Sequence, residues 1–272
     1  MIILSHGGIG RLLEILSANE LVEIAGVFVE SVREPQRTFA DKIKRSIRYD
    51  GYIETLKKLL LKIVGQKTAS FIDSRAVRDE QDDLERVVRE LQIPFYKVDN
   101  FHTFRSIELL KRSDADLGIL YGTNIIKESV FDMPRLGSIN LHQGLAPYYR
   151  GGPTVFWELY NGEKEIGLTV HFVAAEVDTG DIVRQRSVPL RYDFSLYRLD
   201  YEKYLSDFRE TLKEPSAEIL LDAVNQIASG RFERIKQDKT IGKRYRIPTK
   251  RQKDELLKIL KSRKKQRDTK ST

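Results

Sequence analysis

The sequence predicts an α/β protein with an open, mostly parallel sheet, antiparallel strands at one edge and a helical, basic extension. Three observations lead to this fold class. In the first half of the chain, short apolar runs alternate with helical patterns, which is typical of parallel βαβ units. Beyond Gly167, apolar residues recur with a period near two, as in antiparallel strands. From residue 196 the helical period returns, so we expect a domain at 1–195 and an extension at 196–272.

The first strand is predicted at residues 2–4, where a short apolar run ends in a glycine-rich turn. Leucine and isoleucine at helical spacing predict a helix over residues 11–17. Residues 24–29 are rich in β-branched and aromatic side chains and form the second predicted strand. The same patterns predict strands at residues 69–72 and 94–98, with a helix at residues 82–91 between them.

The most apolar strand of the chain is predicted at residues 115–121, after a helix over residues 104–111. Residues 138–141 form a short strand that ends in polar residues. The antiparallel edge strands are predicted at residues 168–173 and 182–190, followed by helix over 196–229 and irregular chain over 239–248. Ligands of such sheets bind beyond the carboxyl ends of the strands, so that edge is searched for chemistry.

The composition excludes several classes of protein. Of the 272 residues, 40% are hydrophobic and 9% aromatic, which suffices for a packed core and excludes a wholly disordered chain. The absence of cysteine excludes disulfides, thiolate zinc sites, iron–sulfur clusters and cysteine nucleophiles. No apolar run approaches the length of a membrane-spanning helix, and the first residues do not resemble a signal peptide. We therefore expect a soluble, cytoplasmic protein.

The net charge of +7 is concentrated in two segments. Residues 31–64 hold nine Lys or Arg against four Asp or Glu, and residues 251–272 hold nine against three. We predict that 251–272 is a solvated, frayed end, with contact to RNA, anionic lipid or an acidic partner as the alternative. Segment 31–64 is predicted to be a basic helical insertion. Its apolar stripe is expected to pack on its own domain rather than on a membrane or a partner: Phe39, Ile43, Ile47, Leu56, Leu60 and Ile63.

A glycine-rich turn, His6-Gly7-Gly8, follows the first strand and opens a helix. Such a turn lets backbone N–H groups approach an anion at a helix N-terminus, although a plain tight turn explains it equally well. It is not the dinucleotide fingerprint, because Leu13 stands where that motif needs its third glycine.

The richest polar stretch surrounds the strand at residues 138–141. Asn140 and His142 lie two residues apart, so their side chains point to the same side of the strand. A hydrogen-bonded core histidine is the structural alternative. Asp178 lies in the turn signal Asp-Thr-Gly between the two predicted antiparallel strands. If that turn folds over the end of the sheet, its carboxylate reaches the imidazole of His142.

These three side-chain types suit acyl transfer to an amine. The attack of an amine on an amide passes through a tetrahedral oxyanion, to which Asn140 and a protonated His142 can donate hydrogen bonds. Asp178 would raise the pKa of His142 and help to move the proton from the attacking nitrogen to the leaving nitrogen. No covalent nucleophile is required.

The sequence resembles the folate-dependent formyltransferase family, most densely over residues 115–190. The matching segments are Asn140-Leu141-His142, residues 145–153, Trp157, Gly162, residues 167–171 and residues 177–180. This resemblance implies a Rossmann-like domain and 10-formyltetrahydrofolate as the donor of the one-carbon group. It also implies that Asn140, His142 and Asp178 are catalytic. The implied folate-binding residues are Tyr121, Gly122, Thr123 and Ile125, with Val177 and Gly180 closing the other side.

The chain also departs from the family pattern. Relatives commonly have serine where this chain has Gly144, and the region after residue 190 lacks the strand-rich pattern of the tRNA enzyme's barrel. The first choice of acceptor is therefore an amino sugar nucleotide, with glycinamide ribonucleotide and methionyl-tRNA as alternatives and tRNA disfavoured. The residues expected to contact the acceptor are His6, Gly7, Gly8, Tyr149, Arg150 and Gly151.

Other functions stay open at this point. The same trio acting on water would hydrolyse formyltetrahydrofolate, although the regulatory module usual in that family is not expected before residue 2. A metal site made by His142, His171 and Asp178 is a second alternative, and we expect no metal. A basic nucleic-acid-binding protein is the alternative outside this chemistry, and an inactive scaffold is the last.

Overall fold

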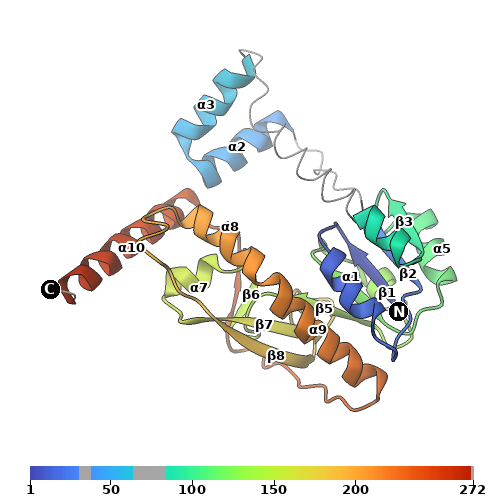
Figure 1. Ribbon diagram of the computed structural model, residues 1–272. Helices are drawn as coiled ribbons and strands as arrows, with labels where there is room; N and C mark the ends of the chain where they lie inside the picture. Colours follow the sequence, from blue (N-terminus) through green and yellow to red (C-terminus); the bar gives the residue numbers. More distant parts are fainter. Residues whose placement is uncertain (31–37, 64–83, 271–272) are drawn as a thin grey trace.

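A seven-stranded sheet forms the centre of the computed structural model, which describes residues 1–30, 38–63 and 84–270 (Figure 1). The strand order is β3-β2-β1-β4-β5-β7-β8. The first five of these strands are parallel, and β7 and β8 are antiparallel. This arrangement confirms the predicted fold class. The strands are β1 (Ile2–Ser5), β2 (Gly26–Glu30), β3 (Phe95–Val98), β4 (Gly118–Tyr121), β5 (Ser138–His142), β7 (Glu165–Phe172) and β8 (Ile182–Pro189).

Helices cover both faces of the sheet. One face packs against α1 (Gly10–Ser17), the helical residues 84–90, α8 (Tyr201–Thr211) and α9 (Lys213–Ala228). The other packs against α5 (Phe104–Arg112) and α6 (Glu128–Phe131). In Figure 1, α9 lies across β7 and β8, and α8 packs against α9. Within the part of the chain that the structure describes, no helix combines the length and the apolar character needed to cross a membrane.

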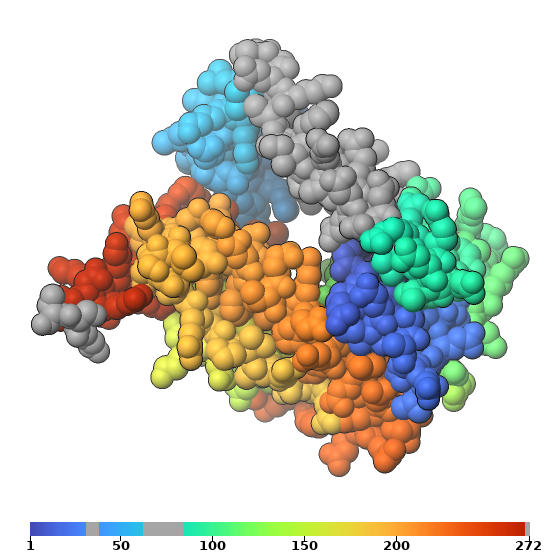
Figure 2. All heavy atoms as spheres, viewed as in Figure 1, coloured from blue at the N-terminus to red at the C-terminus, as the bar shows by residue number. Residues whose placement is uncertain are grey.

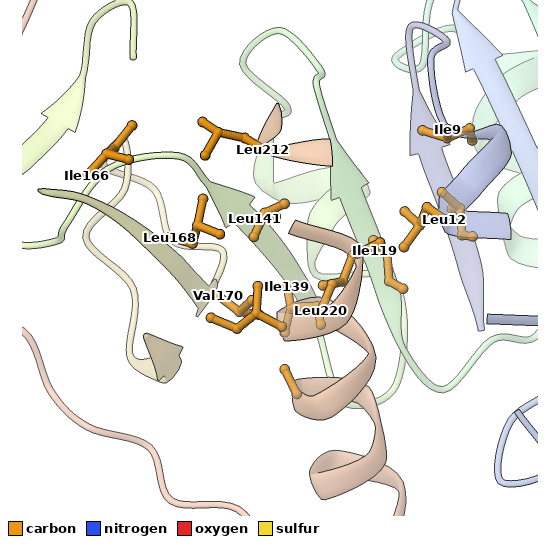
Figure 3. Close-up of a cluster of buried hydrophobic side chains, with 14 of the residues drawn as sticks. Ile9, Leu12, Ile119, Ile139, Leu141, Ile166, Leu168, Val170, Leu212 and Leu220 are labelled. Atoms are coloured by element: carbon orange, nitrogen blue, oxygen red, sulfur yellow. The ribbon is translucent and has the colours of Figure 1, made fainter. Parts of the chain in front are cut away.

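The strand side chains alternate between two hydrophobic clusters, as the period of two in a strand requires. Ile3, Ile119 and Ile139 belong to the cluster on the α9 side, where Leu220 of α9 is fully buried (Figure 3). Ile2, Leu4, Phe28 and Leu120 belong to the opposite cluster. Because both faces are covered, the central parallel strands β1, β2 and β4 are mostly apolar.

Three short elements were not predicted from the sequence patterns. The strands β6 (Tyr149–Gly151) and β9 (Lys243–Tyr245) pair in parallel as a separate two-stranded sheet, and α7 (Phe156–Asn161) follows β6. The prediction that 239–248 is irregular was therefore wrong for β9. A three-residue strand has too few positions to show a period, so long-range pairing alone reveals it. The predicted strand at 69–72 lies outside the described residues.

The predicted helical insertion is present as the hairpin of α2 (Phe39–Asp50) and α3 (Tyr52–Ile63). Thr38 caps α2 by accepting from the N–H of Asp41, and Gly51 between the helices has a φ of 87°. The expected burial of its apolar stripe is only partly correct. Ile43 and Ile47 are half-buried, but Phe39, Leu56 and Leu60 are 64%, 59% and 52% exposed. The two helices pack mainly on each other, and this contact leaves one side of the stripe uncovered.

The basic segment 251–272 is not a frayed end. Residues up to 270 form α10 (Lys250–Lys270), drawn in red in Figures 1 and 2. Leu256 and Leu260 of this helix are fully buried in the same cluster as the sheet residues. The prediction was wrong because it was based on the many charged residues of the segment and gave too little weight to the two leucines, which lie one helical turn apart. The division at residue 195 stays a prediction about functional units, since α8, α9 and α10 share one core with the sheet.

Glu158 on α7 is a buried acid that predicts a pH-dependent stability. It is 3% exposed, and burial raises its pKa to about 7, against which the backbone N–H groups of Glu158 and Val155 act. Because the pKa of this acid is higher in the folded state than in the unfolded state, the free energy of unfolding falls as the pH rises from the unfolded pKa of 4.5 towards 7. Glu158→Gln is therefore expected to raise the free energy of unfolding by about 2–3 kcal/mol more at pH 8 than at pH 5.

Denaturant unfolding of wild type and variant at the two pH values measures this difference. Glu165→Gln, at an exposed position of β7, serves as the matched control and is expected to show no such dependence. Equal effects of Glu158→Gln at pH 5 and pH 8 would contradict the assignment of the raised pKa to this side chain.

Candidate active site

A cleft of about 460 Å³ opens at the carboxyl ends of β4 and β5, the edge at which ligands of open α/β sheets bind. Its volume is within the range of small-molecule sites, roughly 300–1,000 Å³. The lining consists of residues 120–126, residues 140–143, residues 173–178, Gly151, Gly152, Thr154 and His171. Of these segments, 120–126 follows from β4, 140–143 belongs to β5 and its end, and 173–178 leads from β7 towards β8.

The structure brings Asn140, His142 and Asp178 together in this cleft. Asn140 and His142 lie two residues apart on β5, and the turn after β7 places Asp178 Oδ2 3.4 Å from His142 Nδ1. The Nδ2 atom of Asn140 lies 3.3 Å from His171 Nε2. Asp178 adopts a left-handed backbone with a φ of 55°, which turns its side chain back over the sheet edge. A carboxamide, an imidazole and a carboxylate therefore face one space.

The second nitrogen of His142 has its own partner. Its Nε2 lies 2.7 Å from the carbonyl oxygen of Tyr149, so this nitrogen carries a proton and donates it. The close approach explains the glycine at position 144. A Cβ atom at this position would lie 2.3 Å from His142 Nε2 and 2.7 Å from the Tyr149 oxygen. Glycine at position 144 thus leaves room for the imidazole to reach that carbonyl.

Asp178 is held in its charged form. Burial alone would raise its pKa, but hydrogen bonding to His171, the neighbouring His142 and the backbone N–H of Gly151 together lower it well below the ordinary value. Gly151 N donates to Asp178 Oδ2 at 2.8 Å, and His171 Nε2 lies 3.4 Å from Asp178 Oδ1. At neutral pH the site therefore contains a fixed negative charge.

The pKa of His142 is lowered overall, although Asp178 acts in the expected direction and raises it. Burial lowers the pKa of His142, and the carboxylate of Asp178 opposes this effect without overcoming it. Burial therefore favours the neutral form of the imidazole, and the contact with the Tyr149 carbonyl places its proton on Nε2. Its Nδ1 faces Asp178 Oδ2, so a proton accepted there is stabilised by an adjacent carboxylate. The pair is arranged to take up and release a proton.

Most of the predicted folate-binding residues line the cleft: Tyr121, Gly122, Thr123, Ile125 and Val177. Gly180 lies outside the lining and packs against backbone instead. A Cβ atom on Gly180 would lie 1.8 Å from the carbonyl oxygen of Phe172, which leaves no room for a side chain. Gly180 thus allows the Asp178 turn to lie against the end of β7.

This contact predicts that Gly180→Ala destabilises the protein by roughly 1–3 kcal/mol, as overpacking of a rigid contact does, and displaces Asp178. Thermal unfolding measures the loss of stability, and a crystal structure of the variant measures the displacement. Gly10→Ala is the matched control, because its new Cβ would meet Val87 at an ordinary 3.8 Å. A Gly180→Ala protein with unchanged stability would show that the turn can move without loss.

The residues predicted to hold the acceptor divide into two groups. Gly151 lines the cleft, whereas Tyr149 and Arg150, its neighbours on β6, lie outside the lining and Tyr149 donates its hydroxyl to Glu163. His6, Gly7 and Gly8 also lie outside it. His6 Nε2 is 2.9 Å from Glu30 Oε2, and Glu30 Oε1 accepts from the N–H of Phe101. The structure therefore ties His6 to the end of β2 and does not bring it to the trio.

Sequence reasoning assigned no part in the transfer chemistry to His171, although this residue contacts two of the three predicted catalytic groups. Its Nδ1 lies 2.8 Å from the carbonyl oxygen of Phe172 and therefore carries a proton. The register between β5 and β7 places His171 directly opposite Asn140. A prediction of the register between β5 and β7 would have identified His171 as a neighbour of Asn140.

The metal-site alternative has no support in this geometry. Each oxygen of the Asp178 carboxylate lies 3.4 Å from one imidazole, so the carboxylate pairs with His142 and His171 directly. Across residues 1–30, 38–63 and 84–270, no group of three or more His, Asp or Glu side chains is arranged to hold a metal ion.

The fold and the site define an α/β protein with an Asn–His–Asp cluster at the carboxyl edge of its sheet. The model of the formyl transferase family matches residues 65–203, just over half of the chain. The chain therefore belongs to the formyl transferase family, as the resemblance indicates.

Individual relatives agree with this assignment. A methionyl-tRNA formyltransferase of Azobacteroides pseudotrichonymphae is 33% identical over 134 residues, 49% of this chain and 39% of the relative. The chain thus spans less than half of the length of that relative. A 4-N formyltransferase from Francisella tularensis has a TM-score of 0.55 at 16% identity, covering 90% of this chain and 75% of its own. A phosphoribosylglycinamide formyltransferase from Bacillus halodurans has a TM-score of 0.55 at 14% identity, covering 84% and 95%. These two structures share the fold.

Proposed function

We propose that this protein transfers the formyl group of 10-formyltetrahydrofolate to the primary amine of a small acceptor, an amino sugar nucleotide in first place. The observation that carries the proposal is the meeting of Asn140, His142 and Asp178 in one cleft, with Asp178 Oδ2 3.4 Å from His142 Nδ1. Residues 1–195 would form the catalytic domain, and residues 196–272 its helical extension.

The chemistry follows from the charges of the three groups. The amine nitrogen attacks the formyl carbon, and the formyl oxygen becomes an oxyanion that the amide of Asn140 stabilises by a hydrogen bond. The attacking nitrogen loses a proton to His142, where Asp178 stabilises the imidazolium. When the bond between the carbon and the folate N10 breaks, that proton passes to N10. The products are the N-formylated acceptor and tetrahydrofolate.

The loop after β4 fits a folate ring. Residues 122–126 line the cleft, and within the described parts of the chain no hydrogen bond is made by their peptide groups. These free N–H and C=O groups match the alternating donors and acceptors of a pteridine edge. The loop is anchored just beyond, where the N–H of Lys127 donates to His102 Nε2 at 3.0 Å. A held loop with free peptide groups supports the binding of a flat heterocycle.

The choice of acceptor has two candidates. A small amine is favoured because the cleft, at about 460 Å³, has the volume of a small-molecule site. Methionyl-tRNA is the second candidate, since curated relatives that match this chain carry the name of that activity. The basic α2–α3 hairpin is consistent with this alternative.

A direct assay tests the proposal. The full chain is incubated with 10-formyltetrahydrofolate and, separately, an amino sugar nucleotide, glycinamide ribonucleotide or methionyl-tRNA, while the release of tetrahydrofolate is followed. We expect release that depends on the amino sugar nucleotide and a formylated product in the mass spectrum. Release without any amine would instead identify a hydrolase, and no release in any arm would remove the proposal.

A further inference from the structure

The short strand β6 contacts two of the proposed catalytic side chains through its backbone. The carbonyl oxygen of Tyr149 accepts from His142 Nε2 at 2.7 Å, and the N–H of Gly151 donates to Asp178 Oδ2 at 2.8 Å. Backbone groups two residues apart on a strand point to the same side. β6 therefore presents one acceptor and one donor to the site, and its position sets the orientation of both side chains.

β6 depends on the C-terminal segment for its own position. Among the described residues, β9 is the only strand that pairs with it, with Tyr149 opposite Lys243 and Gly151 opposite Tyr245. The N–H of Lys243 donates to the carbonyl of Tyr148 at 3.0 Å. A Cβ atom on Gly151, which has a φ of 65°, would lie 2.9 Å from the Tyr245 oxygen. The two strands thus touch backbone to backbone.

Tyr245 joins the two strands by its side chain as well. Its ring stacks on Tyr149 at 5.1 Å with an interplanar angle of 7°, and it lies 5.0 Å from the ring of Trp157. Asn161 donates to the hydroxyls of both tyrosines, at 2.9 Å and 3.0 Å. The indole of Trp157 donates to the carbonyl of Arg246 just beyond. Tyr245 is therefore held between β6 and α7.

We propose that Tyr245 is a positioning residue of the active site, which holds β6 so that Tyr149 and Gly151 orient His142 and Asp178. The expected effect on kcat rests on the proposed function. The expected effect on the orientation of His142 and Asp178 rests on the geometry alone. β9 lies beyond residue 203, where the match to the family model ends. The C-terminal segment thus acts on the site through β6.

The test compares Tyr245→Ala with Tyr245→Phe, which keeps both ring contacts and loses only the hydroxyl. For Tyr245→Ala we expect kcat for formyl transfer to fall about 10- to 100-fold, as small misplacements of catalytic groups do, with the KM values within about twofold. Tyr245→Phe is expected to restore most of this loss. Tyr197→Ala, in the separate aromatic cluster with Tyr192 and Tyr204, controls for general loss of packing and should keep its kcat.

A second measurement does not depend on turnover. The chain has only four histidines, so ¹⁵N-histidine labelling gives few imidazole signals, and His142→Ala assigns the one of interest. We expect an N–H signal from His142 Nε2, protected by the Tyr149 carbonyl, in wild type and Tyr245→Phe. In Tyr245→Ala the signal is expected to shift and exchange with water. If Tyr245→Ala does not fold, Tyr245→Leu, which keeps apolar bulk without the stack, takes its place.

The outcomes separate the two proposals. A Tyr245→Ala or Tyr245→Leu protein with the wild-type kcat and an unchanged His142 signal would overturn the positioning role. If the wild type transfers no formyl group but its His142 signal still depends on Tyr245, the proposed function fails and the structural part of the inference stands.

Discussion

Asp178→Asn is expected to reduce formyl transfer by about 10³-fold while the protein stays folded. Asparagine keeps an oxygen that can accept from the N–H of Gly151, so the turn retains its anchor. It lacks the negative charge that stabilises a proton on His142, and loss of that charge is the dominant effect when a carboxylate–imidazole pair moves protons. Single-turnover formation of tetrahydrofolate measures the loss.

The control for this variant lies in the same turn. Glu176 also lines the cleft, but its carboxylate pairs with Lys239 in an exposed ion pair. Glu176→Gln removes an equal charge and is expected to change the rate by less than tenfold. His142→Ala should reproduce the large loss. Turnover near the wild-type level in either Asp178→Asn or His142→Ala would remove the assigned roles.

Leu260→Ala is expected to lower the free energy of unfolding by about 2–5 kcal/mol, as truncation of a buried leucine does. The residue is fully buried, although it lies in the most basic of the helices that the structure describes. The same helix is tied to α7 by a hydrogen bond from Tyr160 to Glu255 and by another from Arg263 to the carbonyl of Leu159. Denaturant unfolding of the full chain measures the change.

Leu196→Ala is the matched control, because Leu196 is 72% exposed and its truncation leaves no cavity. We expect this change to cost less than about 0.5 kcal/mol. If Leu260→Ala were equally mild, α10 would not be part of the core.

The order and type of the main elements were open to prediction because they are local properties. A short apolar run that ends in a glycine-rich turn identified β1, and leucines at helical spacing identified α1. The spacing of Asn140 and His142 along β5 was enough to place both side chains on one side of the strand. The Asp-Thr-Gly turn suggested where Asp178 would fold. These patterns depend only on residues within one element.

The composition of a segment gave wrong predictions of burial where burial depends on tertiary packing. The segment after residue 250 has the composition of a solvated tail, yet Leu256 and Leu260 are fully buried in the larger hydrophobic cluster. The apolar stripe of α2 and α3 has the composition of a buried face, yet Leu56 is 59% exposed. Whether an apolar residue is covered depends on which elements reach it, and no window of neighbouring residues contains that information.

The sequence alone determined the layered sheet, the family and three residues with the right chemistry for formyl transfer. Only the tertiary structure decided that His171 contacts Asn140 and Asp178, that Gly144 makes room for His142, and that β9 pairs with β6. The contacts of His171 and the pairing of β9 with β6 join segments that are distant along the chain, and the contact at Gly144 depends on how residues 142–149 fold back on themselves. Such contacts form when the whole core is buried together, which is why local patterns do not reveal them.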